Sequence, residues 1–283
     1  MKPPDFDYVA PTSIEDAVRS LAGEPDAKVL AGGQSLIPLL AFRLAGPSLL
    51  VDLARIEELV GTSERDGTIT IGAMTRQRRA EGDPLMIAGC PLLVESLKHV
   101  GHRQIRSRGT VGGSIVHADP AGELPAVLLA LNGRVIVVGP KGRRTIQAAD
   151  LFEGFLTTAL EPDEILVEIE LPRTGDSTGH AVVEIARRPG DFALCGAICQ
   201  VERGPGGEVA DARVALIGVG DRPVRAHTVE AAMIAGAQPL EAAAHAADGL
   251  SPLTDVHASA DYRLHLAQVV TRRALTQALE RAG

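Results

Sequence analysis

The alternation of apolar and polar positions predicts a chain of short strands and short helices. Gly67–Ala73 alternates with the period of two that suits a strand with one buried face. Pro11–Val18 instead offers Thr12 or Ser13 as a helix N-cap, followed by an acidic first turn. We expect further strands at Ala27–Leu30, Leu49–Leu53, Arg134–Val138 and Ile165–Leu171, and helices from Pro11 to Gly23, Thr75 to Glu81, Leu92 to His99 and Leu124 to Leu131.

The second part of the chain begins after a segment of turn-forming residues. Arg173–Gly179 contains two glycines and several polar residues, and it makes the best domain boundary. Beyond it we expect strands near Ala181–Ile185, Cys195–Glu202 and Ala212–Val219, a hairpin loop at Arg203–Gly207, and helices near Thr228–Ala235, Pro239–Ala247 and Tyr262–Arg281. The mixture predicts an α+β fold rather than regular βαβ alternation.

Composition excludes several classes of function. The chain has 283 residues, 45% of them hydrophobic and only 2% aromatic, with a formal net charge of −8, so a nucleic-acid-binding surface is not expected. Its three cysteines cannot supply the four ligands of an ordinary iron–sulfur cluster. Cys195 and Cys199 lie four apart in a predicted strand and are expected to be buried structural residues. No apolar run reaches the length of a membrane span, and no secretory signal is evident, so we expect a cytoplasmic protein.

Two glycine-rich segments carry the candidate chemistry. Lys28–Leu36 and Arg108–Ile115 each place a Gly-Gly pair and a hydroxyl residue beside an apolar run. Glycine lets backbone N–H groups approach an anion closely, and successive N–H groups in a turn form a nest that suits phosphate. Two such segments about eighty residues apart predict that a pyrophosphate, and hence a dinucleotide, is held from both sides. Each pair taken alone is more typical of an ordinary turn.

The motifs of the common nucleotide folds are absent. The sequence contains neither the G-x-G-x-x-G pattern of Rossmann domains nor the G-x-x-x-x-G-K-[ST] pattern of P-loops. His99, His102 and His117 lie near the second segment without metal-site spacing, so no metal site is expected. Arg103, Arg106 and Arg108 form a basic run that fits a solvated face and phosphate contacts about equally well.

The chain resembles the FAD-binding medium subunits of the molybdenum hydroxylases, the family of the carbon monoxide dehydrogenase and xanthine dehydrogenase flavoproteins. The resemblance runs nearly end to end. It rests on Phe6–Pro11, Leu30–Leu36, Gln104–Ile115, Ala118–Pro125, Thr157–Pro162 and Arg187–Ala193, and it extends to Tyr262 and Arg263.

This resemblance implies a role for each candidate residue. Backbone N–H groups of the first segment would wrap the FAD pyrophosphate, the second segment would meet the phosphates and ribityl chain, and Glu123, as an ionised acceptor, would meet ribityl or sugar hydroxyls. Asp119 would shape a turn beneath the cofactor, Val100 and Gly101 would line the adenine, and Leu160 and Asp191 would lie near the isoalloxazine ring. The implied contacts of the two segments are Ala31, Gly32, Gly33, Gln34 and Ser35, and Thr110, Val111, Gly112, Gly113 and Ser114.

The resemblance also implies the architecture. Residues 1–177 would form a two-subdomain FAD-binding domain of the vanillyl-alcohol-oxidase (PCMH) type, with subdomains of about 1–56 and 57–177. Residues 178–283 would form a small α+β C-terminal domain of the carbon monoxide dehydrogenase flavoprotein type. The chain departs from the family at Gln34, where His is common, and at Glu184, where Lys is frequent. Arg187 or Arg188, which lie nearby in the sequence, could supply a cationic flavin contact in place of that lysine.

The implied function is electron transfer within a larger hydroxylase. Non-covalent FAD would take electrons from [2Fe–2S] clusters on a small partner subunit and pass them to an external acceptor. A large partner subunit would carry the molybdopterin cofactor, in a dimer of heterotrimers. No side-chain acid or base is needed for this task, and we nominate no catalytic residue. The alternatives are a self-sufficient FAD-dependent oxidoreductase acting directly on a small molecule, and an assembly module that has lost FAD.

Overall fold

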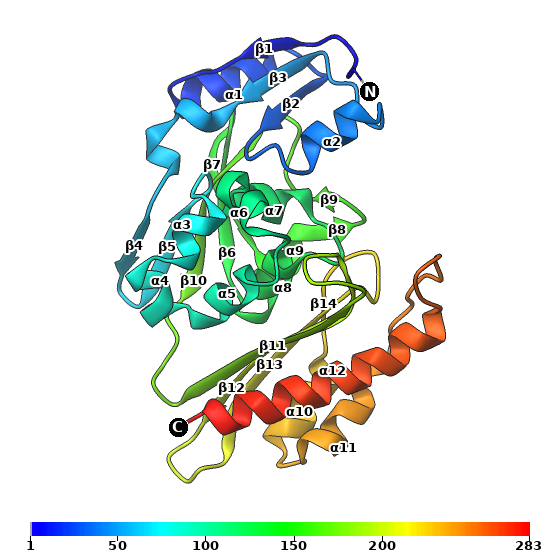
Figure 1. The fold of residues 1–283 in the computed structure, drawn as a ribbon. Helices are drawn as coiled ribbons and strands as arrows, with labels where there is room; N and C mark the ends of the chain where they lie inside the picture. The colour runs from blue at the N-terminus through cyan, green and yellow to red at the C-terminus, as the bar shows by residue number, and fades with distance from the viewer. Residues whose placement is uncertain (1) are drawn as a thin grey trace.

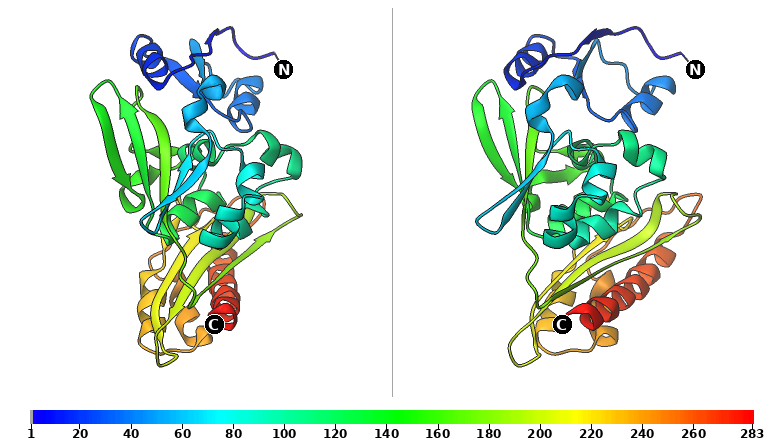
Figure 2. Two further views of the ribbon diagram at one scale, coloured as in Figure 1. Left: turned by 90° about the vertical axis from the view of Figure 1, so that its left-hand side faces the viewer. Right: turned by 60° about the vertical axis from the view of Figure 1, so that its left-hand side comes forward.

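Three sheets follow one another along the length of the molecule (Figure 1), and two other views show the same order (Figure 2). The computed structural model describes residues 2–283. The first sheet is parallel, in the order β1-β3-β2, and is formed by β1 (Asp7–Val9), β2 (Ala27–Leu30) and β3 (Leu49–Asp52). α1 (Ile14–Ala22) and α2 (Leu36–Ala41) supply the crossovers that parallel neighbours require. Ser13 Oγ accepts a hydrogen bond from Asp16 N and caps α1, which confirms that predicted helix start.

The second sheet is antiparallel and forms the middle of the molecule. Its order is β4-β5-β10-β6-β7, from β4 (Thr62–Arg65), β5 (Thr68–Gly72), β6 (Arg134–Gly139), β7 (Gly142–Gln147) and β10 (Ile165–Pro172). Short helices cover it: α3 (Gln77–Glu81), α4 (Pro84–Gly89), α5 (Pro91–Leu97), α6 (Arg103–Arg108), α7 (Val111–His117), α8 (Glu123–Ala130) and α9 (Ala148–Leu151). Two 3₁₀ turns, Leu53–Arg55 and Glu57–Leu59, lead into the sheet, and a small hairpin, β8 (Phe152–Gly154) and β9 (Thr157–Thr158), projects beside it.

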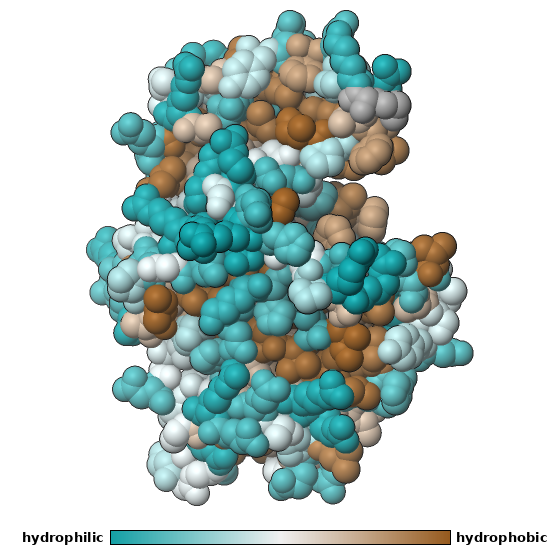
Figure 3. All heavy atoms as spheres, in the orientation of Figure 1, coloured by the Kyte–Doolittle hydropathy of each residue, from teal (hydrophilic) through white to brown (hydrophobic). Residues whose placement is uncertain are grey.

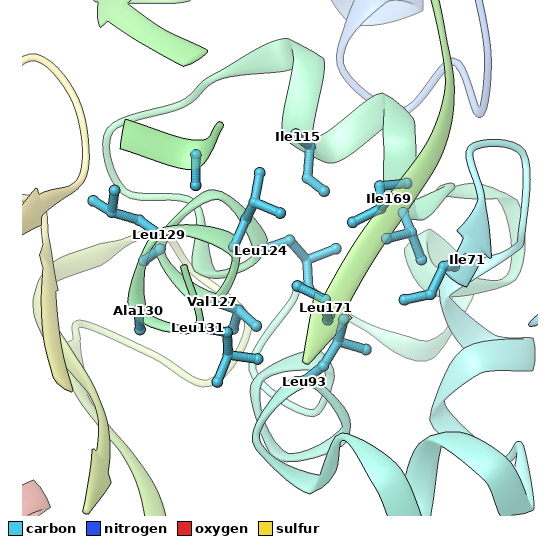
Figure 4. Close-up of a cluster of buried hydrophobic side chains, with 14 of the residues drawn as sticks. Ile71, Leu93, Ile115, Leu124, Val127, Leu129, Ala130, Leu131, Ile169 and Leu171 are labelled. Carbon is cyan, nitrogen blue, oxygen red and sulfur yellow. The ribbon is translucent and has the colours of Figure 1, made fainter. Parts of the chain in front are cut away.

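The main core lies between this sheet and its helices. Ile71 and Ile169 from the sheet meet Leu93 of α5, Ile115 of α7 and Leu124 of α8 (Figure 4). Every residue of α8 after Glu123 is buried, which confirms the predicted buried helix. The cause is that α8 packs against the middle sheet's helices on one side and against the C-terminal sheet on the other.

The C-terminal sheet is antiparallel, and both of its faces are buried. Its strands are β11 (Thr178–Ala186), β12 (Ala193–Arg203), β13 (Val209–Ile217) and β14 (Val224–Arg225). Ala181, Cys195 and Cys199 face the long helix α12 (Ala260–Arg281), whereas Val182 and Ile198 face α5 and α8 of the middle layer. The cysteines are therefore buried structural residues, as predicted. The remaining helices of this layer are α10 (His227–Ile234), α11 (Pro239–Ala243) and the 3₁₀ turn Ala244–Ala247.

The helix predicted from Thr75 to Glu81 does end at Glu81, and a helix that was not predicted, α4, follows it directly. Pro84 occupies the first turn of α4, and Asp83 caps that helix by accepting a hydrogen bond from Leu85 N. Proline suits this position because its missing N–H would lack an intrahelical partner there anyway. The second glycine segment was expected to be a loop. It forms helix α7, preceded by α6, and both Gly112 and Gly113 lie inside α7.

Candidate functional site

The two glycine segments lie against each other. A Cβ placed on Gly32 would come within 2.6 Å of Arg108 O and 2.8 Å of Gly109 Cα, and a Cβ on Gly113 would come within 3.2 Å of Ala31 Cβ. The backbones meet this closely only because neither glycine has a side chain. The two segments therefore lie together in the fold, as predicted. Their close packing is enough to explain why residue 32 is glycine.

The first segment offers free backbone donors. It leaves β2 after Leu30, turns at Gly33 with a φ of 73°, and enters α2. Within the described part of the chain, the N–H groups of Gly32, Gly33, Gln34 and Ser35 have no backbone or side-chain acceptor, and Gln34 Nε2 donates to Gly32 O at 3.2 Å. Consecutive unpaired N–H groups of this kind suit an anion.

The second segment is engaged in a different way. Val111 N donates to Thr75 O and Gly112 N to Ala73 O, so these two donors serve packing of α7 on the turn after β5. A Cβ on Gly112 would lie 2.7 Å from Ala73 Cβ, which is why this position is glycine. Thr110 Oγ1 accepts from Gly113 N at 3.1 Å and caps the helix. Val111 and Gly112 therefore have no free N–H group for a phosphate, and the implied contact of the second segment with the phosphates and ribityl chain stays a prediction. Ser114 remains partly exposed on the helix.

A cavity of about 430 Å³ opens beside the first segment. It lies where the turn after β2 and α2 face α6, and the outline of the molecule is hollowed on the right-hand side between the uppermost part and the body (Figure 3). The lining combines glycines, apolar residues, one amide, one carboxylate and two guanidinium groups: Leu30, Ala31, Gly32, Gly33, Gln34, Ile37, Pro38, Asp52, Ala54, Arg76, Ile105 and Arg108. Its volume lies within the range of small-molecule sites.

Arg76 and Arg108 bring two guanidinium groups to this cavity against the single carboxylate of Asp52. Arg76 Nη1 donates to Arg108 O, and burial together with the charge of Arg108 lowers the pKa of Arg76 from its ordinary value. Two guanidinium groups held beside free N–H groups favour a diphosphate. Sequence reasoning considered Arg108 but missed Arg76, Asp52 and Ile105, because these residues reach the cavity only through the tertiary fold.

The rest of the basic run has different tasks. Arg106 is buried, contacts Glu81 Oε2 through Nε at 3.1 Å, and donates through Nη1 to the carbonyl oxygens of Val100 and Gly101. It therefore fixes the segment expected to line the adenine. Arg103 is exposed. Arg108 lines the cavity and therefore fits the interpretation of the basic run as a phosphate contact. Arg106 fits neither that interpretation nor a solvated face, because it is buried and its guanidinium group is already paired.

Asp119 and Glu123 form the turn between α7 and α8. Asp119 Oδ1 accepts from Ala121 N at 2.8 Å, so it shapes the turn as predicted. Burial raises the pKa of Glu123 to about 7, with the charges of Glu184 and Asp119 acting in the same direction and that of His99 opposing them. The sequence argument took Glu123 as fully ionised, whereas this environment places its titration close to neutral pH.

Leu160 and Asp191, which were expected near the isoalloxazine ring, do not line the cavity described above. Leu160 is half-buried and packs on the main core. Asp191 is contacted by Arg188 Nε at 3.3 Å and by Arg187 Nη2 at 3.6 Å, so both arginines serve the loop between β11 and β12. Glu184 is paired with His99. The basic side chain that contacts Glu184, at the family's lysine position, is thus His99, which sequence reasoning did not consider for this role.

These features fit an FAD diphosphate. Free N–H groups, glycines without room for side chains, and two guanidinium groups line the same cavity. In the described residues, no cluster of three or more potential metal ligands is found, and no helix is long and apolar enough to cross a membrane.

Comparisons with known families agree with this site. Residues 4–174 match the family described as the FAD binding domain in molybdopterin dehydrogenase, and residues 180–278 match the CO dehydrogenase flavoprotein C-terminal domain. The chain belongs to the family of FAD-binding medium subunits of molybdenum hydroxylases, which are oxidoreductases.

The chain is similar over its whole length to several members. It is 42% identical to the 6-hydroxypseudooxynicotine dehydrogenase complex subunit alpha of Paenarthrobacter nicotinovorans, covering 100% of this chain and 97% of that one. A structure of carbon monoxide dehydrogenase from Hydrogenophaga pseudoflava superposes with a TM-score of 0.97 at 39% identity, covering 100% of both chains. Quinoline 2-oxidoreductase from Pseudomonas putida 86 gives a TM-score of 0.95 at 38% identity, covering 100% of this chain and 99% of that one. The α+β fold, with an FAD-binding domain and a C-terminal domain, is confirmed.

Proposed function

We propose that this chain receives electrons from [2Fe–2S] clusters on a small partner subunit and passes them through non-covalent FAD to an external acceptor. A large partner subunit carries the molybdenum cofactor and oxidises the substrate. The observation that carries the proposal is the end-to-end similarity to medium subunits, together with the cationic, glycine-lined cavity. The chain's three cysteines are each buried in apolar surroundings, so it offers no thiolate set for a cluster of its own.

The residues act by binding and orienting the cofactor, whose isoalloxazine ring supplies the redox chemistry when bound. The N–H groups of Gly32 to Ser35 and the guanidinium groups of Arg76 and Arg108 hold the pyrophosphate. Val100 and Gly101, fixed by Arg106, border the adenine. Glu123 accepts hydrogen bonds from ribityl hydroxyls, and Ser114 contacts the phosphates and ribityl chain, as the family resemblance implies. Leu160 and Asp191 border the ring.

The partner surface is proposed to include the hairpin β8–β9. Phe155 and Leu156 form its tip and expose 65% and 38% of their surfaces, and Leu156 adopts a φ of 53°. A β-hairpin tip is usually polar or glycine-rich, and a leucine in this conformation is costly, so the tip is better explained by contact with another chain. We propose assembly as a dimer of heterotrimers, and the cytoplasmic location stays a prediction.

The domain boundaries are also proposed as predicted. Residues 1–56 contain the parallel sheet, 57–177 the middle sheet and 178–283 the C-terminal sheet. The separate sheets support these limits, because all the paired strands of each sheet come from within one of these three ranges.

Purification of the chain through an affinity tag, from cells that make it naturally, tests the function. We expect two further subunits to accompany it, with about four irons and one molybdenum for each FAD. Anaerobic addition of dithionite, followed by stopped-flow mixing with an acceptor, should show cluster and flavin absorbance recovering together. A chain that purifies alone, with FAD but without iron or molybdenum, and that oxidises a small molecule directly would contradict the proposal.

A further inference from the structure

Asp52 stands at the end of β3, beside the first glycine segment. β2 and β3 are parallel neighbours, and their register pairs Leu30 with Asp52, the last residue of each strand. The chain leaves β2, turns at Gly33, passes through α2 and returns along β3 (Figure 1), so Asp52 closes the β-α-β unit that the glycine turn opens. Ligands of parallel sheets bind outside the carboxyl ends of the strands, which is where both features lie.

Asp52 brings a negative charge to a cavity that otherwise suits a diphosphate. It is half-buried, and among residues 2–283 it is the only acid that lines the cavity. Like charges repel, so a carboxylate is unfavourable beside phosphate groups unless it meets a different part of the ligand. Asp52 also caps the 3₁₀ turn Leu53–Arg55, but Ser, Thr and Asn are caps that carry no charge. The charge therefore requires an explanation beyond the turn.

The Asp52 carboxylate is fixed in place with acceptor capacity left over. Ala54 N donates to Asp52 Oδ1 at 2.9 Å, and Tyr8 Oη donates to Asp52 Oδ2 at 2.7 Å. Tyr8 belongs to β1, so the carboxylate is held both by its own turn and by the neighbouring strand. An ionised carboxylate has about four acceptor sites, and the described residues occupy one on each oxygen. About one site on each oxygen therefore remains for a ligand.

The same cavity extends to the segment expected to line the adenine. A Cβ on Gly101 would lie 3.3 Å from Ile105 Cγ1, and Ile105 lines the cavity together with Asp52. In FAD the adenosine ribose joins the pyrophosphate to the adenine. With the pyrophosphate at Gly32–Ser35 and the adenine at Val100 and Gly101, the ribose falls within this cavity.

We propose that Asp52 accepts hydrogen bonds from both hydroxyl groups of the adenosine ribose of FAD, and so makes the site specific for the adenosine half of the cofactor. The proposal rests on the proposed binding of FAD in this cavity. The two hydroxyls lie on adjacent carbons of the ribose and each can donate, which matches the acceptor site left on each carboxylate oxygen. FMN has no adenosine and gains nothing from Asp52.

The test compares ADP, 2′-deoxy-ADP and 3′-deoxy-ADP as competitors of FAD on the purified complex from which FAD has been removed. The wild type should bind each deoxy compound about tenfold to a hundredfold more weakly than ADP, because each lacks one hydrogen bond to a charged acceptor. Asp52→Ala should bring both ratios close to one. Asp52→Asn keeps an oxygen for Ala54 N and should give intermediate ratios. The affinity for FMN should not fall in either variant.

The matched control is Asp83→Ala. Asp83 accepts from Leu85 N at 2.9 Å and from Thr62 Oγ1 at 2.6 Å, so it makes the same two kinds of local bond as Asp52, but it does not line the cavity. This variant should keep the wild-type ratios, because a loss of local bonds alone does not change how the ribose hydroxyls are recognised.

Wild-type ratios in Asp52→Ala, or in Asp52→Asn if the alanine variant does not fold, would overturn the proposal while leaving the function intact. Equal affinity of the wild type for all three nucleotides would do the same, as would the loss of both ratios in Asp83→Ala. Failure of the wild type to bind FAD at all would instead overturn the proposed function.

Discussion

The contact between Gly32 and the backbone before α7 gives a direct test of how the two glycine segments cooperate. In Gly32→Ala the new Cβ would lie 2.6 Å from Arg108 O and 2.8 Å from Gly109 Cα, both of them backbone atoms that cannot rotate away. The segments must therefore separate by several tenths of an ångström. Overpacking of this kind costs about 1–3 kcal/mol. Because the strain falls on the segment that carries the free N–H groups and on Arg108, most of it should appear as lost FAD affinity.

The expected result is an FAD dissociation constant about 5- to 150-fold higher than that of the wild type. It can be measured by quenching of flavin fluorescence, with thermal unfolding of the FAD-free form as a check on folding. Gly82→Ala is the matched control, because its Cβ would meet nothing closer than Arg78 O at 3.9 Å and its φ is −105°. Wild-type affinity in a folded Gly32→Ala variant would refute the account of why these segments meet.

Three further predictions concern charge and burial. Replacing Arg76 or Arg108 by Gln should weaken FAD binding roughly fivefold and make the dissociation constant less sensitive to salt. Equal salt sensitivity in the wild type and both variants would place the pyrophosphate elsewhere. Burial opposes ionisation of Glu95, but hydrogen bonds from His180 and Arg281 outweigh it and lower the pKa of Glu95 to about 2. The stability that the Glu95 carboxylate contributes is complete above its unfolded pKa near 4.5 and is lost as the pH falls toward 2. Glu95→Gln should therefore lower the thermal midpoint at pH 7 more than at pH 3. Equal losses at the two pH values would be inconsistent with this role. Burial raises the pKa of Cys90 and Cys195 to about 12 and that of Cys199 further still, so the native protein should not react with a thiol reagent at pH 8, and fast labelling would show that these sites open.

Local patterns were sufficient to predict most elements. β2 has the predicted bounds Ala27–Leu30, and α8 was recognised from its unbroken apolar run. The glycines were harder to interpret. Gly112 and Gly113 indicated a phosphate turn, yet the first packs against Ala73 within a helix. Close helix packing and close approach to a ligand both require glycine, so sequence alone does not distinguish them.

The candidate site was predictable only where it depends on one contiguous segment. The turn from Ala31 to Ser35 was identified because its donors follow one another along the chain. Arg76 reaches the same cavity from the turn before α3, and no spacing rule connects it to residue 32. The pairing of His99 with Glu184 crosses from the turn after α5 to β11 and depends on how the C-terminal sheet packs. Side chains brought together by tertiary packing leave no periodic signal in the sequence.

The most direct test of the central claim is an absorption spectrum of the protein, purified with the subunits that accompany it, before and after acid precipitation. Our account predicts flavin bands in the native protein and their complete release into the supernatant as FAD, identified by its mass. A native protein without flavin absorbance that stays colourless when FAD is added, or a flavin that remains with the precipitate, would contradict it.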